Sequence, residues 1–167
     1  FGLGFRYEDT FNNSNATRLY IHDINGEGAN NISGFYIQNG AHHITLSNSI
    51  IHSIAHSDGG PSAAAKIFAS GSTYLRAHHN VVFDGEAGES MEGLNNKHGG
   101  GGLLGSTASA GTDPVWENDH NIFWGLSSYW NPIASANSSA HHNICYGTVT
   151  NQCFIIDGGA GGPSWVK

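Results

Sequence analysis

Residues that could carry acid–base chemistry are concentrated in one stretch of the sequence, from Asp84 to His98. The stretch holds the carboxylates of Asp84, Glu86 and Glu89 and ends with Lys97 and His98. Carboxylate oxygens are ligands that calcium prefers, and a Lys or His side chain can act as a general base. We therefore take these five residues as candidates for a site that combines acid–base chemistry with cation binding. The alternative is a solvated loop, loosened by glycines, with ordinary surface charges.

Two cations and three aromatic residues are candidates for binding a sugar. Lys66 and Arg76 would face a sugar carboxylate together if their side chains share one face of the structure. Trp124, Tyr129 and Trp130, if exposed, could stack on pyranose rings. The alternative is that the two cations are single exposed charges and that the aromatic side chains stack inside the fold.

The chain contains 11 histidines, and six of them form the adjacent pairs His42-His43, His78-His79 and His141-His142. Neighbouring residues of a strand point to opposite faces, so an adjacent pair does not by itself chelate a metal. His79, His120 and His142 each precede an asparagine. We expect these three to stack as an external ladder rather than to bind zinc, because no Cys or carboxylate recurs with them at ligand spacing.

A short pattern recurs along the chain and organises the rest of it. The pattern runs from Ala77 to Gly85, from Asp119 to Gly125 and from Ala140 to Gly147, with a looser version from Leu46 to His52. In each copy an Asn is followed by a short apolar run, which is too brief for a helix and suits a strand. Asn also tolerates the left-handed conformation of a sharp corner, and its amide can bond the Asn of the next repeat. The predicted corner asparagines are Asn48, Asn80, Asn121 and Asn143.

This repeat pattern resembles the right-handed parallel β-helix of the pectate-lyase-like superfamily. The resemblance covers the chain from about Thr17 to Val166. It implies an all-β solenoid of about six coils with three short strands in each coil. We accordingly expect one β-helix domain over residues 1–167, with an irregular lead-in at 1–16 and an inserted loop at 84–112.

Composition supports an all-β chain and excludes some classes of partner. The chain has 24 Gly and only 11% charged residues, which is unlike a helical protein. Its net charge is −7 and it has no basic run, so nucleic acid is not an expected partner. No apolar stretch approaches the roughly 20 residues that a membrane span requires.

Features of secreted proteins are also present. Sequons occur at Asn12, Asn15, Asn31 and Asn137, which are candidate glycosylation sites. Cys145 and Cys153 lie eight residues apart and either form a disulfide or remain buried thiols. The chain starts at Phe1, and the stretch from Pro163 to Lys167 reads as a strand in mid-coil. We therefore expect a piece of a longer solenoid, located outside the cell or on its surface.

The resemblance also suggests function. Polysaccharide lyases of this architecture remove the proton beside a uronate carboxylate, often with calcium, so we expect a module that binds or processes acidic polysaccharide. The resemblance implies Lys97 or His98 as the catalytic base and Asp84, Glu86 and Glu89 as candidate Ca²⁺ ligands. Trp116 to His120 resembles the Trp-x-Asp-His segment of pectate lyases, but with one residue added and without the flanking arginine motif, so that family's calcium ligands are not carried over. The alternative is a non-catalytic segment of a fibre, tailspike or surface glycoprotein that stacks with further coils end to end.

Overall fold

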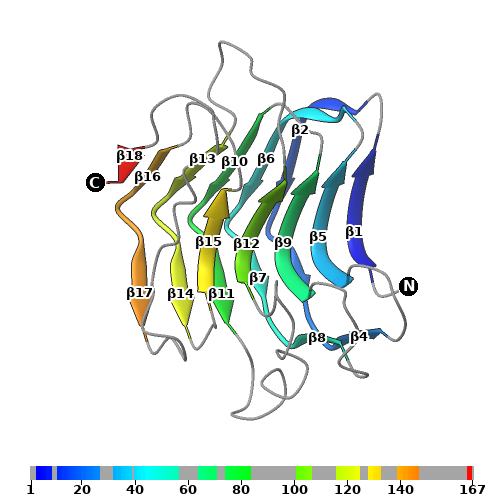
Figure 1. Cartoon of the computed structure of the whole chain (residues 1–167). Coiled ribbons are helices and arrows are strands. Elements are labelled where there is room, and N and C mark those ends of the chain that lie inside the picture. The colour runs from blue at the N-terminus through cyan, green and yellow to red at the C-terminus, as the bar shows by residue number, and fades with distance from the viewer. Residues whose placement is uncertain are drawn as a thin grey trace.

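The chain folds into parallel β-sheets (Figure 1). The computed structural model describes residues 3–8, 11–26, 32–38, 40–56, 64–70, 74–83, 101–106, 116–124, 128–132, 139–146 and 165–166. Within these ranges every regular element is a strand, and the fold is all-β. Since the described residues form no helix, none of them forms one long and apolar enough to cross a membrane.

Three larger sheets and one small sheet contain all the described strands. Sheet A contains β1 (Leu3–Glu8), β5 (Ile32–Gln38), β9 (Ala64–Ser70), β12 (Gly101–Ser106) and β15 (Ser128–Pro132). Sheet B contains β2 (Asn12–Thr17), β6 (His42–Ser47), β10 (Leu75–His78), β13 (Trp116–Asp119), β16 (Ser139–His141) and β18 (Trp165–Val166). Sheet C contains β3 (Tyr20–Ile21), β7 (Ile50–Ile51), β11 (Val81–Phe83), β14 (Ile122–Trp124) and β17 (Ile144–Tyr146). Sheet D pairs β4 (Ile24–Gly26) with β8 (Ile54–His56).

The described strands β1 to β17 visit sheets A, B and C in turn, the first two times passing through sheet D as well, and then return to sheet A one strand further along. We call one such visit a pass. The third pass contains β9 to β11, the fourth β12 to β14 and the fifth β15 to β17. Each strand pairs in parallel with its counterpart in the next pass, so equivalent side chains lie about 4.8 Å apart along the sheet.

The core lies between the sheets and is built from alternate residues of the strands. In β5, Phe35 and Ile37 are fully buried, and in β6 so are Ile44 and Leu46. In sheet C, Phe123 fills the equivalent inward position. All five belong to one cluster of buried side chains, and burying each apolar side chain of this size stabilises the fold by about 1.5–3 kcal/mol.

The expected irregular lead-in at residues 1–16 is wrong, because β1 and most of β2 lie inside it. Phe5 of β1 lies in register with Phe35, and the two rings stack with centroids 5.7 Å apart. In β2 the sequence is almost entirely polar, and among its residues only Ala16 is buried. The alternation of apolar and polar residues that identifies a strand is therefore absent, although the backbone pairs with β6.

The expected inserted loop at residues 84–112 contains a paired strand. β12 lies between β9 and β15 in sheet A, and Leu103 aligns with Ile67 on one side and Trp130 on the other. It is therefore the sheet A strand of the fourth pass and not part of an insertion. The rest of that range lies outside the described residues.

The corner between sheets B and C is made by a residue with positive φ, which at three of the five described corners lies one position before a predicted corner asparagine. The five corner residues have φ between 50° and 59°, and they are Arg18, Asn48, His79, His120 and His142. Asn80, Asn121 and Asn143 do not adopt this conformation, so the expectation that they supply the left-handed corner is wrong. Only Asn48 occupies such a position, where Asn is tolerated better than most residues.

The asparagines that follow the corner form a ladder, in which Asn80 and Asn121 are buried and Asn143 is partly buried. The Asn80 side-chain amide donates to Asn121 Oδ1 at 3.0 Å, and the Asn121 amide donates to Asn143 Oδ1 at 3.1 Å. The backbone N–H groups of Asn80 and Asn121 each donate to the same side-chain oxygens at 2.8 Å. In the second pass Ser49 takes this place, and its N–H donates to Asn80 Oδ1 at 3.0 Å. Asn48 is exposed and does not belong to the ladder.

We predict that Asn121→Ala will lower the free energy of unfolding by about 2–3 kcal/mol, because it leaves the buried N–H of Asn80 without an acceptor. Urea denaturation followed by circular dichroism measures this loss. Asn48→Gly is the matched control, since it keeps a residue that tolerates positive φ at an exposed corner. We expect the control to change stability by no more than about 0.5 kcal/mol. Equal losses in both variants would contradict a special role for the ladder.

Candidate functional site

A group of ionisable side chains lies on the outer face of sheet B, next to the corner with sheet C. In β10, Arg76 lies between the buried Leu75 and Ala77 and therefore points outward. In β13, Glu117 and Asp119 occupy the two positions on either side of the buried Asn118. Because β10 and β13 are paired, Arg76 aligns with Glu117.

Arg76 holds the carboxylate of Asp119 with two hydrogen bonds. Arg76 Nε donates to Asp119 Oδ1 at 3.1 Å, and Nη2 donates to Oδ2 at 3.3 Å. Arg76 Nε also lies 3.5 Å from Glu117 Oε2, which accepts a hydrogen bond from the Tyr74 hydroxyl at 3.2 Å. The side chain of Asp119 is only 2% exposed, so its carboxylate is largely removed from water, whereas the Arg76 side chain is 39% exposed.

The pairing sets the protonation of the group. Burial alone would raise the pKa of Asp119, but hydrogen bonds from Arg76 and His120 outweigh burial and hold that pKa below its ordinary value. The hydrogen bond to Asp119 also raises the pKa of Arg76. Burial, followed by the nearby Arg76 charge, lowers the pKa of His78. At neutral pH the site therefore holds the Asp119 carboxylate, the Arg76 guanidinium and the neutral imidazole of His78 in close proximity.

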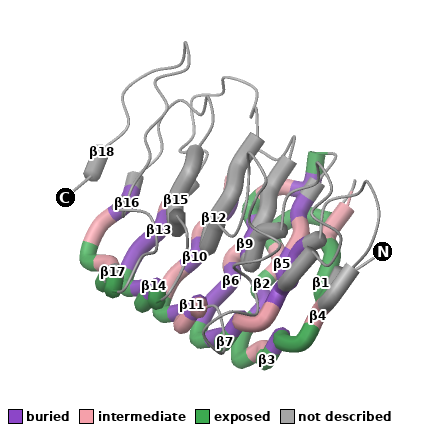
Figure 2. The backbone as a smooth tube through the Cα atoms, turned by 60° about the horizontal axis from the view of Figure 1, so that its bottom comes forward, coloured by how far each residue is buried: buried purple, intermediate pink, exposed green. Residues whose placement is uncertain are grey.

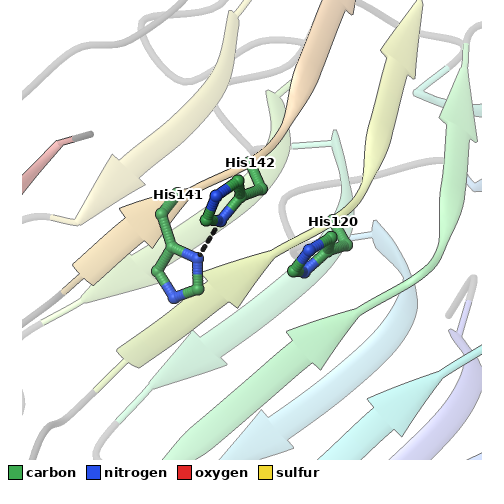
Figure 3. Close-up of side chains that lie close together, drawn as sticks. All are labelled: His120, His141 and His142. Carbon is green, nitrogen blue, oxygen red and sulfur yellow. Dashed lines mark hydrogen bonds between the residues drawn. The ribbon is translucent and has the colours of Figure 1, made fainter.

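Three exposed histidines form a stack along the corner. The rings of His79 and His120 have centroids 4.9 Å apart and an interplanar angle of 3°, and those of His120 and His142 are 4.9 Å apart at 11°. His120 Nδ1 lies 2.9 Å from Asp119 Oδ2, which ties the stack to the ion pair. His141 crosses the stack edge-on, with its centroid 6.1 Å from that of His120 (Figure 3).

The outer face of sheet C carries a continuous row of rings. His22 stacks on His52 with centroids 5.4 Å apart, His52 stacks on Phe83 at 4.5 Å, and Phe83 contacts Trp124 at 5.6 Å. Trp124 is 50% exposed, and Tyr146, which aligns with it in β17, is 70% exposed. We call these five residues the ring row.

A second exposed row runs beside the ring row. It contains Tyr20, Ile50, Ile122 and Ile144, all exposed, with the partly buried Val81 in register between Ile50 and Ile122. Figure 2 shows exposed positions, in green, along the edge where sheet B turns into sheet C. The two rows make this face unusually apolar for a surface in contact with water.

The structure places the predicted sugar-binding residues on different sheets. Trp124 belongs to the ring row on sheet C, whereas Arg76 lies on sheet B. Lys66 lies in β9 of sheet A, one sheet away from Arg76, and its side chain is not described. Tyr129 and Trp130 lie in β15 of sheet A, and their side chains are likewise not described.

The candidate catalytic and calcium-binding residues lie outside the described ranges. They are Lys97, His98, Asp84, Glu86 and Glu89.

Of the sequons, Asn12 and Asn15 lie in β2 and are exposed, while Asn31 and Asn137 are outside the described residues. Cys145 lies in β17 with an undescribed side chain, and Cys153 is outside the described residues, so the proposed disulfide stays a prediction.

The sequence interpretation did not select Tyr74, Glu117 or Asp119 as site residues. A signal was present, because aligning the repeats on Asn80 and Asn121 places Arg76 level with Glu117 and His78 level with Asp119. The same alignment predicts the pairing of Phe83 with Trp124. Alternation along each strand then puts these side chains on the outer face.

No protein-family model, curated protein or solved structure matches this chain.

We predict that Asp119→Asn will destabilise the protein at pH 7, where wild-type Asp119 is a carboxylate paired with Arg76 and His120. Because the pKa of Asp119 is lowered on folding, its contribution is present above its ordinary pKa of 3.8 and is lost as pH falls through the folded value. The difference in urea midpoint between wild type and variant should therefore shrink from pH 7 to pH 3. A constant difference across this range would contradict the role of the charge.

Proposed function

We propose that this chain is a segment of a right-handed parallel β-helix, outside the cell or on its surface, that binds polysaccharide. Three observations support the solenoid. The described strands from β1 to β17 visit sheets A, B and C in a constant order, each return advances by one strand, and all pairing among the described strands is parallel. A buried ladder of side-chain amides at a repeated corner adds to this support. Right-handed crossover is the usual hand for parallel connections.

The observation that carries the binding function is the ring row on sheet C. Phe83 and Trp124 lie in register in neighbouring strands, and Trp124 is half exposed. A sugar ring has an apolar face that can lie against an aromatic side chain, while its hydroxyls remain hydrogen-bonded at the edge. A linear polysaccharide therefore matches a row of rings that extends over several passes better than a compact ligand does.

Polar groups lie within a few residues of both exposed rows. The corner histidines His79, His120 and His142 immediately precede the strands of sheet C and are exposed to solvent. Imidazole nitrogens can donate or accept hydrogen bonds, which suits sugar hydroxyls. Arg76 and Glu117 extend this polar zone onto sheet B.

Processing of the bound polysaccharide is the second part of the proposal. This part of the proposal assigns Lys97 or His98 as the base that removes the proton from the sugar, and Asp84, Glu86 and Glu89 as the calcium ligands. Its support comes from the sequence alone. The net charge of −7 repels a polyanion, so binding of an acidic polysaccharide should depend on calcium more than binding of a neutral one.

We predict that Trp124→Ala and Phe83→Ala will each weaken polysaccharide binding by up to about tenfold, because each removes one stacking surface. Affinity electrophoresis in gels containing neutral or acidic polysaccharides, with and without calcium, measures the retardation. Phe11→Ala is the matched control, because Phe11 is 55% exposed and packs against Tyr7, away from the ring row. The control should migrate like wild type.

Two outcomes would contradict parts of this proposal. If no polysaccharide retards the wild-type chain while its β-structure is intact, the binding function is wrong, and filaments in electron microscopy would then favour the structural alternative. If binding occurs but no ultraviolet absorbance from unsaturated uronates develops with any acidic polysaccharide, the lyase chemistry is wrong and the chain is a binding module.

A further inference from the structure

Three histidines converge where the fourth and fifth passes turn from sheet B into sheet C. His120 lies at the corner after β13, His141 ends β16, and His142 lies at the next corner. Each offers one ring nitrogen that lies within 4.8 Å of the nitrogens offered by the other two. His120 and His142 are exposed and His141 is partly exposed, so an ion can reach them from solvent (Figure 3).

His141 and His142 already lie near the spacing of two ligands on one ion. Their Nδ1 atoms are 2.9 Å apart. Two imidazole nitrogens on a tetrahedral zinc ion, each about 2.0–2.1 Å from the metal, are about 3.4 Å apart. A small rotation of the two rings therefore exchanges their mutual hydrogen bond for two bonds to a metal. His120, stacked on His142, is exposed and offers a nitrogen within 4.8 Å of the nitrogens offered by the other two.

A buried carboxylate orients the third histidine. Asp119 Oδ2 lies 2.9 Å from Nδ1 of His120, so that nitrogen carries the proton and Nε2 is left as the ligand atom. Asp119 is held in turn by Arg76 and is almost inaccessible to water. Histidine ligands of metal sites commonly donate their second nitrogen to a carboxylate in this way, which fixes the ring and raises its basicity.

A competing set of ligands is less suitable. Glu117, Asp119 and His141 also offer atoms within 4.8 Å of one another. However, Arg76 lies 3.1 Å from Asp119 and 3.5 Å from Glu117, so a cation bound by these carboxylates would lie beside a guanidinium. Repulsion between the two positive charges favours the all-histidine set.

We propose that His120, His141 and His142 bind one divalent transition-metal ion of the zinc type. Imidazole ligands suit zinc, copper and nickel, whereas calcium and magnesium require oxygen ligands. Three protein ligands leave a position open to water or another molecule. None of the three histidines belongs to the ring row or to the proposed calcium ligands Asp84, Glu86 and Glu89.

The other adjacent histidines provide an internal comparison. The Nδ1 atoms of His42 and His43 are 2.8 Å apart, and those of His78 and His79 are 2.9 Å apart. Among the residues that the structure describes, neither pair belongs to a group of three possible ligands within 4.8 Å. Close contact between two histidines is therefore insufficient, and the third ligand distinguishes the proposed site.

The test uses the whole chain without a histidine tag, stripped of metal by chelation and titrated with zinc chloride in a calorimeter. We expect one zinc ion per chain. His141→Gln and His142→Asn should each weaken binding at least about tenfold, because each removes one ligand. Asn at position 142 keeps a residue that tolerates the positive φ of that corner. His43→Asn, at a position of β6 that also has a positive φ of 55°, is the matched control and should bind zinc like wild type.

Cobalt provides a second readout, since tetrahedral Co²⁺ with nitrogen ligands absorbs visible light and this absorbance should be lost in His141→Gln and His142→Asn. The proposal is overturned if the wild-type chain, with its β-structure intact, binds no zinc. It is also overturned if both variants bind zinc as tightly as wild type, or if His43→Asn weakens binding as much as they do. Trp124→Ala should leave zinc binding unchanged, which separates this site from the ring row.

Discussion

The hydrogen bonding of the backbone at the corner between sheets B and C is the constraint on which the structure depends. At each corner one residue adopts positive φ, and the following backbone N–H points along the direction in which the passes stack. Asn121 and Asn143 satisfy these donors with their side-chain oxygens, and their amide groups donate to the backbone carbonyls of Ala77 and Asn118. Without such acceptors, each buried N–H would cost about 1–3 kcal/mol.

The ladder also determines which side chains meet on the surface. A shift of one residue in register would move every inward side chain to the outer face. With Asn80 fixed against Asn121, Val82 lies on Phe123 inside the fold and Phe83 lies beside Trp124 outside it. On the sheet B side, the same register aligns Arg76 with Glu117. The ring row and the ionic group are therefore consequences of a single alignment made at the buried corner.

The repeat around Asn80, Asn121 and Asn143 was sufficient to predict strands after each corner and an all-β fold, because local apolar runs and turn residues carry that information. The expectation of an irregular lead-in fails at β2 because this strand is polar and pairs with β6 through its backbone, which the side-chain pattern does not reveal. In β1, by contrast, the apolar residues Leu3, Phe5 and Tyr7 do alternate with other residues, so the strand signal was present. The looser repeat is offset by one residue, so Ser49 and not Asn48 occupies the position equivalent to the ladder asparagines. Contacts such as Arg76 with Asp119 join residues 43 positions apart, so they emerge only once the register is known.

Asp119 connects the stability of the fold to the chemistry of its surface. The same buried carboxylate neutralises Arg76 and orients His120, because it accepts hydrogen bonds from both side chains. The pairing keeps Asp119 ionised despite burial, and an ionised Asp119 in turn favours a proton on Nδ1 of His120. Nε2 of His120 is then available either to a sugar hydroxyl or to a metal ion. A charge buried for structural reasons thus determines which atom the exposed histidine presents to a ligand.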